Sequence, residues 1–598
     1  MQKKLKEIFE KAIAIIREYP LVLVMAILAA VFLICMTQIG VSTKSEFLFG
    51  KLALVFSLGI SLTFALNMLS QRIGKIFLLQ LAGILFLVFF YFLLPNEEKK
   101  FTERYAFLIF PTFILSHLLV SFIAFFGQKK ELNFWQYNKN LFINIFLTVV
   151  FTGVLIAGIQ LAIVAVDQLF DFKFNNSYYK NPFIILSVFG SCFIFLLFNV
   201  TGLLSLEKDG DYPQILKFFT QFILIPLLLI YVIILYFYSA KILLSWELPK
   251  GWVSYLVLAY SLVGIFALLL VHPLKEDRSK SWVQLFNKIF YFTLIPLLVL
   301  LFTAIFTRIL QYGYTEARYF VLLLAVWLLT VVVYFIFKGK ETIKFVPISL
   351  FCFGLFALAF PFLNSFSVAK NSQKKELNKI LAENKLLENG KINFNLKVPD
   401  SVATEISDKF QFLAKRQENL YLKNLLNPQI AEKFENEKKK GNFYETARIV
   451  KGGFKNITAE SIAKGNLTNS KNIILTISNL ATPVSKYDYL FKAYNYKNNI
   501  FRYNENLIEI NLQNSQVRTK LFFIFNGTVI DLMPELETLF NDTNESGEFK
   551  VDDLSIYKTV GKFNFKFIFD NISKVQTPGK KAEYYINSES VLILVKEN

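Results

Sequence analysis

The chain has 598 residues, of which 54% are hydrophobic and 17% aromatic, and its mean hydropathy is +0.45. Soluble proteins average about 45–50% apolar residues, so this composition excludes an ordinary soluble protein. The net charge of +19 does not indicate nucleic-acid binding, because the basic residues are scattered between apolar runs and form no single stripe. A lipid bilayer with an anionic surface is the simpler partner for these lysines.

Residues 1–19 predict an amphipathic helix on the membrane surface, because basic residues alternate with apolar ones at helical spacing. The next run, 21–39, is long enough to span a bilayer and lacks a convincing cleavage site. It is therefore interpreted as a retained first span and not as a signal peptide.

The excess of apolar residues lies almost wholly before residue 365. Crossing a bilayer core takes roughly 20 apolar residues in a helix. We expect a polytopic α-helical membrane domain at 20–364 with about eleven spans, or ten to twelve if a short run is re-entrant. The runs are 21–39, 52–69, 76–94, 105–126, 141–166, 182–204, 218–238, 253–271, 289–310, 317–337 and 345–362.

Basic residues between the spans predict the orientation, since cytoplasmic loops carry an excess of Lys and Arg. With a cytoplasmic N-terminus, an odd number of spans places the C-terminal part outside the cytoplasm. One miscounted run would reverse the side of everything after it. The basic residues expected inside, after those of 1–19, are Arg72, Lys75, Lys129, Lys130, Lys139, Lys208, Lys217, Lys275, Arg278, Lys280, Lys288, Lys338, Lys340 and Lys344.

Polar residues inside spans are functional candidates, because placing them in hydrocarbon is costly. Gln160, Asp167 and Asp171 are seven and four residues apart, which predicts one helix face and an ion or proton entrance. The alternative, that both aspartates mark the end of the helix, is favoured. His117 lies mid-span without a second ligand at i+3 or i+4, so helix packing is favoured over a metal or proton role.

A polar stretch, 308–319, separates the apolar runs 289–310 and 317–337 and predicts the turn of a transmembrane hairpin. Gly313 suits the left-handed position after a helix. Thr315 can cap the second helix, and Glu316 is favourably placed in its first turn. Arg308 and Arg318, with Glu316, are candidates to bind an anionic lipid headgroup or to dock the C-terminal part. Composition alone favours the alternative, an interface belt of tyrosines with snorkelling arginines.

The pattern Arg-x-x-x-Tyr-Gly-x-Thr-x-x-Arg-Tyr is carried by Arg308, Tyr312, Gly313, Thr315, Arg318 and Tyr319. It resembles the signature of a family of uncharacterised bacterial multi-pass membrane proteins, classed as a domain of unknown function. Tyr487-Asp488-Tyr489-Leu490 is similar to a second segment of that family, Gly-Tyr-Asp-Tyr-Leu, with Lys486 in place of the glycine. The resemblance implies an integral-membrane fold and no particular activity.

The character of the chain changes near residue 365. Helical spacing over 372–389 and 402–426 predicts a juxtamembrane helical region at 365–430. Alternation over 508–512 and 563–569 predicts strands, and 533–540 a helix, in an α+β domain at 431–598. Turn residues at 504–506, 514–516 and 578–579 favour a largely antiparallel sheet. This α+β domain is expected to be extracytoplasmic.

The C-terminal third contains no histidine or cysteine and no motif of a known catalytic or phosphate-binding site. The three cysteines, Cys35, Cys192 and Cys352, all lie in apolar runs. Asp488 is the one nominated general base, and a turn role is favoured for it. No metal or cofactor is expected, and enzymatic activity is not favoured.

The leading hypothesis is a non-enzymatic envelope sensing, interaction or scaffold protein of the bacterial cytoplasmic membrane. Its partners would be the bilayer, with envelope proteins or lipid headgroups. The alternative is a secondary transporter or lipid flippase, motivated by the number of spans and by scattered intramembrane polar groups. A membrane-embedded transferase is a third reading, for which the sequence offers no cluster of carboxylates or histidines.

Overall fold

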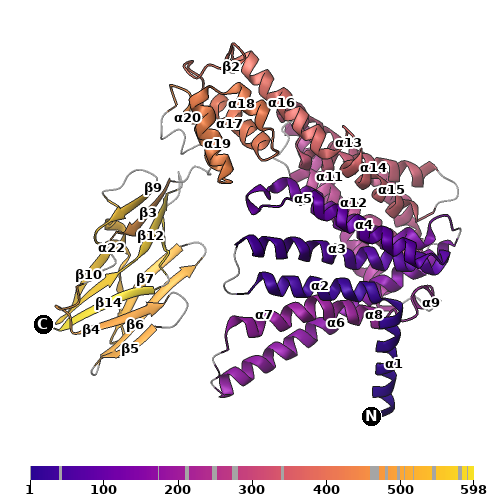
Figure 1. The fold of residues 1–598 in the computed structure, drawn as a ribbon, viewed down its shortest axis with the longest axis horizontal. Helices are drawn as coiled ribbons and strands as arrows, with labels where there is room; N and C mark the ends of the chain where they lie inside the picture. Colours follow the sequence, from indigo (N-terminus) through magenta and orange to yellow (C-terminus); the bar gives the residue numbers. More distant parts are fainter. Residues whose placement is uncertain are drawn as a thin grey trace. The chain divides into compact units, whose positions relative to one another are not determined.

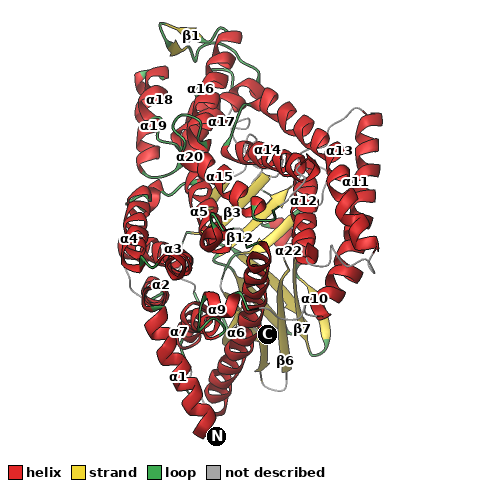
Figure 2. Ribbon diagram, turned by 90° about the vertical axis from the view of Figure 1, so that its right-hand side faces the viewer, coloured by secondary structure: helices red, strands yellow, loops and turns green. Residues whose placement is uncertain are grey.

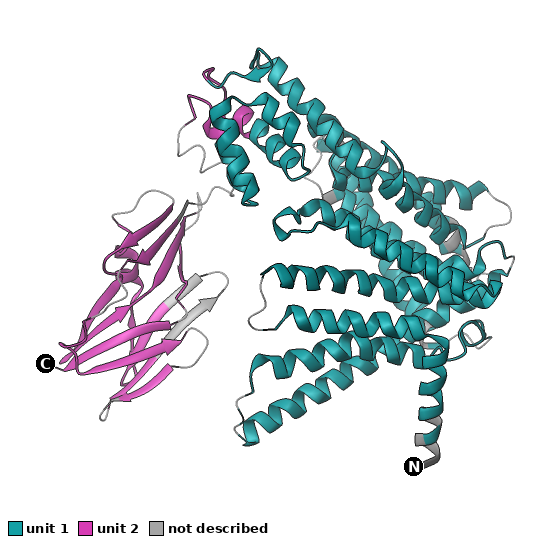
Figure 3. Cartoon of the chain, viewed as in Figure 1, with its two compact units in different colours: residues 1–394, 405–450 teal, residues 395–404, 451–598 magenta. Residues whose placement is uncertain are grey.

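The computed structural model describes two compact units (Figure 3). The helical unit comprises Met1–Phe394 and Glu405–Val450, and the sheet unit comprises Asn395–Thr404 and Lys451–Asn598. The described residues are 2–38, 43–128, 130–170, 172, 174–208, 214–245, 252–272, 281–337, 342–457, 471–478, 483–494, 499–503, 506–515, 518–541, 547–576, 582–588 and 590–597. Asp171, the predicted turns at 504–506, 514–516 and 578–579, and the loop residues Lys129, Lys275, Arg278, Lys280, Lys338 and Lys340 lie wholly or partly outside them.

Long apolar helices build most of the helical unit (Figures 1 and 2). Apart from α1, which is amphipathic, the long helices are apolar on all sides, as expected of helices that face either lipid or one another. Their bounds are α1 Gln2–Glu18, α2 Pro20–Met36, α3 Thr43–Ile73, α4 Ile76–Leu93, α5 Glu103–Phe122, α6 Glu131–Phe170, α7 Asn176–Ile185, α8 Ser191–Leu197, α9 Leu203–Leu206, α10 Gln214–Phe218, α11 Ile225–Ser245, α12 Trp252–Val271, α13 Ser281–Tyr312, α14 Glu316–Phe337 and α15 Phe345–Ala359. Two π-helical segments, Leu186–Gly190 and Phe219–Leu224, join α7 to α8 and α10 to α11.

The chain is a multi-span membrane protein, but the predicted count of eleven spans is not confirmed. Among the described residues, nine helices are long and apolar enough to cross a bilayer. A tenth is reached if Phe9–Glu18 and Pro20–Met36, bent by 95°, count as one span. Helix α15 has only 15 residues. The sequence count treated short apolar runs as full spans, although roughly 20 residues are needed for a crossing.

Hydrogen bonds tie together distant segments at each end of the helical unit. At one end, the Tyr319 hydroxyl donates to the Leu363 carbonyl at 2.6 Å. At the other, the Tyr19 hydroxyl donates to the Asn199 carbonyl at 2.7 Å. Helix α5 connects the two ends, since Glu103 at its start pairs with Lys415 and Ala124 beyond its end accepts from Arg72. The chain therefore enters the row of apolar helices at one end and leaves it at the other.

Polar helices follow the last apolar one and group beside α16 (Figures 1 and 2). The predicted helix 402–426 is interrupted: Glu418 N–H donates to Leu413 O and Gln417 N–H to Ala414 O, the two bonds of a Schellman motif. Gln417 takes the left-handed position with φ 63°. The bounds are α16 Ser365–Glu383, α17 Asp400–Ala414, α18 Asn419–Leu425, α19 Pro428–Lys439 and α20 Phe443–Gly452, with a small hairpin of β1 Leu387–Glu388 and β2 Lys391–Ile392.

The described residues of the sheet unit form three four-stranded sheets, ordered β10-β11-β14-β4, β13-β12-β3-β9 and β5-β6-β7-β8. Among these described strands all pairs are antiparallel except β3 with β9, which agrees with the α+β class. The predicted strands are β6 and β11, and the alternation over 563–569 buries Phe563, Phe565, Phe567 and Phe569 in the core. The bounds are β3 Lys471–Ile477, β4 Tyr489–Tyr494, β5 Asn499–Tyr503, β6 Asn506–Ser515, β7 Arg518–Phe525, β8 Thr528–Asp531, α22 Met533–Thr538, β9 Gly547–Val551, β10 Ser555–Val560, β11 Phe563–Ile568, β12 Asn571–Gln576, β13 Glu583–Ile586 and β14 Ser590–Glu597.

Candidate functional site

The polar turn between α13 and α14, residues 312–316, is called the hinge here. Gly313 has φ +73°, a conformation that glycine adopts without a steric penalty. Thr315 Oγ1 accepts from the Arg318 backbone N–H at 3.4 Å and so caps α14. The Arg318 guanidinium turns back and donates to the Gly313 carbonyl at 2.7 Å. The Arg318 side chain therefore closes the turn by binding the turn's backbone.

Side chains from α16 and α17 hold the hinge backbone. Gln373 Nε2 donates to the carbonyls of Tyr312 at 2.9 Å and Tyr314 at 2.8 Å. Ser372 Oγ accepts from the Tyr314 N–H at 2.9 Å. Lys409 Nζ donates to the Tyr312 carbonyl at 3.2 Å. We call Ser372, Gln373, Lys409 and Arg416 the hinge clamp.

The strongest contact of the hinge clamp is a buried ion pair. Arg416 donates from Nε and Nη2 to the two carboxylate oxygens of Glu316, at 2.6 and 2.5 Å. Glu316 is 1% exposed and Arg416 7%. Two parallel charge-assisted bonds fix distance and orientation together. Arg416 also donates to the Phe412 carbonyl at 2.9 Å, and its guanidinium carbon lies 3.2 Å from the Phe412 ring centre.

The break between α17 and α18 positions this arginine. Arg416 is the last residue before the left-handed Gln417, so it lies where the chain leaves the helix. Lys409 lies seven residues earlier, which places both cations on one helix face. Burial lowers the pKa of the Lys409 ammonium, and the nearby carboxylates of Glu405 and Glu376 act in the opposite direction.

Two lysines of α16, Lys370 and Lys374, form a second charged group with Glu418, next to the break. Lys370 Nζ lies 2.9 Å from the Glu418 carboxylate. Burial acts to raise the pKa of Glu418, but hydrogen bonds from Lys374 and Lys370 outweigh it and hold this pKa below the usual 4.5. This group stabilises the packing of α16 against the start of α18.

The lowered pKa predicts a pH-dependent contribution to stability. A carboxyl group with a depressed folded-state pKa stabilises fully above its unfolded value and loses this as the pH falls through the folded value. We expect Glu418→Gln to lower stability by about 1 kcal/mol at pH 7. The difference from wild type should shrink as the pH falls below 4.5, measured by thermal unfolding.

The matched control for this prediction is Glu383→Gln. Glu383 pairs with Lys379 at 4.0 Å, and both side chains are more than half exposed. Exposed pairs of this kind contribute little. A Glu418→Gln variant whose melting temperature follows that of Glu383→Gln at every pH would contradict the assignment.

The other residues of the predicted turn 308–319 have smaller roles. Arg308 is half-buried and makes no hydrogen bond or ion pair within the ranges that the structure describes. The Tyr312 ring is exposed and lies 5.4 Å from the Arg318 guanidinium carbon. The hinge clamp thus recognises the Tyr312 carbonyl, not its side chain. Tyr319 is buried and holds the start of α14 to Leu363.

The predicted intramembrane residues Gln160 and Asp167 both contact Tyr179. Gln160 Nε2 donates to the Tyr179 carbonyl at 2.8 Å. Asp167 accepts from the Tyr179 hydroxyl at 2.9 Å and from the Phe174 N–H at 2.8 Å. The two side chains share a helix face and tie α6 to the start of α7, and Asp171 lies outside the described residues.

His117 is exposed on α5, and its Nδ1 lies 2.8 Å from the Phe113 carbonyl of the same helix. It therefore points away from the packed interior, so the structure does not place it in the helix-packing role that the sequence favoured. Among the residues with described positions, no group of three His, Cys, Asp or Glu side chains is arranged to hold a metal ion.

Tyr487 and Asp488 lie directly before the start of β4 in the sheet unit. The Asp488 N–H donates to the Val595 carbonyl at 2.9 Å, and its carboxylate accepts from the Glu597 N–H at 2.9 Å. Asp488 is exposed and continues the pairing of β4 with β14. The backbone N–H of Tyr487 donates to Val484 O at 3.0 Å. These contacts belong to a strand end.

Sequence reasoning missed Gln373, Lys409 and Arg416. Lys409 and Arg416 are seven residues apart in the predicted helix 402–426, and this spacing is the signal that could have indicated one charged face. Nothing in the local sequence of Gln373 distinguishes it from the polar residues around it. Their common partner lies on a turn about 60 to 100 residues earlier in the chain.

Two comparisons relate the chain to other proteins. Over 218 residues the chain is 29% identical to the "Uncharacterized protein PM1469" of Pasteurella multocida (strain Pm70), which covers 35% of this chain and 36% of that relative. No solved structure matches the chain. A family model described as "Domain of unknown function (DUF4153)" matches residues 17–389, from the end of α1 through α16 to the β1–β2 hairpin. Because this match extends over more than half of the 598 residues and includes the whole hinge, the chain belongs to the DUF4153 family.

Proposed function

We propose that this protein is a non-enzymatic envelope protein whose membrane helices act on a juxtamembrane helical module through the hinge clamp. The buried Glu316–Arg416 pair carries this proposal. It links the first turn of a membrane helix to the end of α17, and Gln373 and Lys409 add bonds to the same turn. A movement of α13 against α14 would change the positions of these carbonyls and hence the clamp.

Because the ion pair is buried, we infer that it selects one arrangement of the helices and does not simply stabilise the fold. Apolar residues of similar volume often stabilise as well as or better than a buried pair, so such a pair is a poor device for stability alone. Its best-attested use is to fix one arrangement among several. Here the arrangement is the seating of α17 on the α13–α14 turn, which we infer to be the sensing contact.

We further propose a bacterial cytoplasmic-membrane location with a cytoplasmic N-terminus and an extracytoplasmic C-terminal part. Two observations support this orientation. Tyr19 and Leu363 lie at opposite ends of the helical unit, as an odd number of crossings requires. Arg72, Lys139 and Lys344, which are expected in the cytoplasm, lie with Tyr19 at the end away from the hinge. Envelope proteins or lipid headgroups are the partners that this side offers.

The test is a pair of fusions after Asn598, one to alkaline phosphatase and one to a fluorescent protein that matures only in the cytoplasm. We expect phosphatase activity without fluorescence. Fusions after Gly313 and after Gly74 provide the internal comparison, because they lie at opposite ends of the helical unit. Fluorescence from the Asn598 fusion would overturn the orientation and direct the search to soluble cytoplasmic partners.

A further inference from the structure

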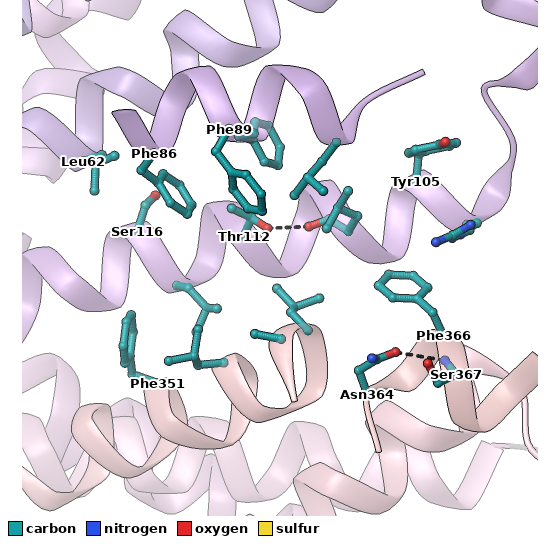
Figure 4. A pocket seen from close by; sticks show the side chains of 18 of the residues that line it. Leu62, Phe86, Phe89, Tyr105, Thr112, Ser116, Phe351, Asn364, Phe366 and Ser367 are labelled. Carbon is teal, nitrogen blue, oxygen red and sulfur yellow. Dashed lines mark hydrogen bonds between the residues drawn. The ribbon is translucent and has the colours of Figure 1, made fainter. Parts of the chain in front are cut away.

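A partly open cavity of about 690 Å³ lies in the helical unit, between α4, α5, α15 and α16 (Figure 4). Most of its wall is apolar, and Phe86, Phe89 and Phe351 point into the same space. Ligand-binding cavities in proteins are commonly about 300–1,000 Å³. The long apolar part is therefore large enough for a chain-like hydrophobic ligand.

The opposite end of the cavity is basic. Arg104, Lys370 and Arg416 line it, and none of the described lining residues is an aspartate or glutamate. The N-terminus of the 19-residue α16 opens at this end, where Asn364 Oδ1 accepts from the Ser367 N–H at 2.9 Å (Figure 4). A helix N-terminus adds the positive end of the helix dipole.

The three cations differ in how their charge is compensated. Arg416 holds Glu316, and Lys370 shares Glu418 with Lys374. The Arg104 guanidinium carbon lies 5.1 Å from the Phe366 ring centre, and no carboxylate lies within ion-pair distance of it in the described part of the chain. Arg104 is thus a half-buried cation without a counter-charge among the described residues, positioned where the apolar cavity ends.

We propose that this cavity binds one membrane lipid with an anionic phosphate headgroup. An acyl chain occupies the apolar part, and the phosphate lies against Arg104 at the N-terminus of α16. A neutral apolar molecule leaves the Arg104 charge uncompensated, and a soluble anion leaves the apolar wall without a partner. Only an amphiphile satisfies both ends, and the surrounding bilayer supplies it.

The basic end of the cavity also meets the hinge clamp, because Arg416 belongs to both. A phosphate at this end adds negative charge next to the Glu316–Arg416 pair and competes for the same guanidinium. The lipid would therefore weaken the clamp. This link rests on the proposed function, whereas lipid binding itself does not.

The test uses the full chain in phosphatidylcholine nanodiscs that contain a small fraction of a second lipid. In one sample this lipid is phosphatidylglycerol, and in the other it is a phosphatidylcholine with the same acyl chains as that phosphatidylglycerol. Native mass spectrometry counts the lipids that stay bound. We expect one retained phosphatidylglycerol in the wild type and roughly tenfold weaker retention in Arg104→Gln, from the loss of one charge-assisted bond. Lys99→Gln is the matched control, since Lys99 is an exposed cation of the preceding turn that does not line the cavity.

A second variant tests the apolar end. Ala359→Trp fills the cavity and should remove the bound lipid, while Ala106→Trp on the exposed face of α5 should retain it. Equal retention of the two lipids by the wild type, or equal effects of Arg104→Gln and Lys99→Gln, would overturn the proposal. Displacement by inorganic phosphate would mean that an anion site exists without a lipid site. The stability of the Arg416 variants is measured separately, and it tests the proposed role of the hinge clamp independently of lipid binding.

Discussion

Replacing Arg416 by methionine is expected to cost about 3–5 kcal/mol, because it leaves the Glu316 carboxylate buried without its counter-charge. Glu316 is 1% exposed, and both of its carboxylate oxygens accept hydrogen bonds from Arg416. Thermal unfolding in a fixed detergent gives the loss, and hydrogen exchange of the hinge amides shows where it occurs. The double variant Glu316→Leu/Arg416→Met should recover much of the stability, since neither charge then remains buried.

Lys415→Met is the control for this prediction. Lys415 precedes Arg416 and also pairs with a glutamate of the membrane helices, Glu103, at 2.7 Å. Glu103 is 71% exposed, so losing this pair should cost no more than about 1 kcal/mol. Equal losses in Lys415→Met and Arg416→Met would show that the buried pair has no special role.

Gly313→Ala is expected to have the second largest effect, about 2–4 kcal/mol, from backbone strain together with lost hydrogen bonds. The left-handed φ of +73° disfavours any side chain. A Cβ at this position would lie 2.8 Å from Glu376 Cγ, 2.9 Å from Ser372 Oγ and 3.0 Å from Gln373 Nε2. Relief of these contacts moves α16 away from the carbonyls that Gln373 holds.

Gly74→Ala separates the two causes. Gly74 has nearly the same φ, +74°, and a Cβ there meets nothing within 4 Å. It should therefore show only the backbone penalty, about 1–2 kcal/mol. Hydrogen exchange of peptides from the hinge and from the start of α16 should rise in Gly313→Ala and stay unchanged in Gly74→Ala. Equal stability losses in both variants would remove the argument that α16 packs tightly on the hinge.

The sequence predicted the membrane helices well and their number less well. An apolar run of 20 residues is a local property, and the cost of placing polar backbone in hydrocarbon forces it into a helix. A run that falls short of this length, such as that of α15, is not decided by composition. The hinge was equally readable, because a left-handed glycine and a capping threonine act within their own turn.

The partners of the hinge were not readable in this way. Glu316 and Arg416 are 100 residues apart. On its own, Glu316 looks like a charged residue at a helix start, and Arg416 looks like a charged residue within the predicted helix 402–426. The predicted helix 402–426 also hid the break at Gln417, since its apolar spacing continues across it. Helical periodicity reports which face is buried, but it does not report whether the helix is continuous.

By itself, then, the sequence determined a membrane domain of apolar helices, a polar hinge between two of them and an α+β C-terminal part. Each of these follows from hydrophobicity, periodicity and turn chemistry within about 20 consecutive residues. The tertiary structure alone decided that α16 and α17 clamp the hinge and that a basic end completes an apolar cavity beside it. Those features depend on distant side chains meeting in a water-poor interior, where an unpaired charge is too costly to leave without a partner.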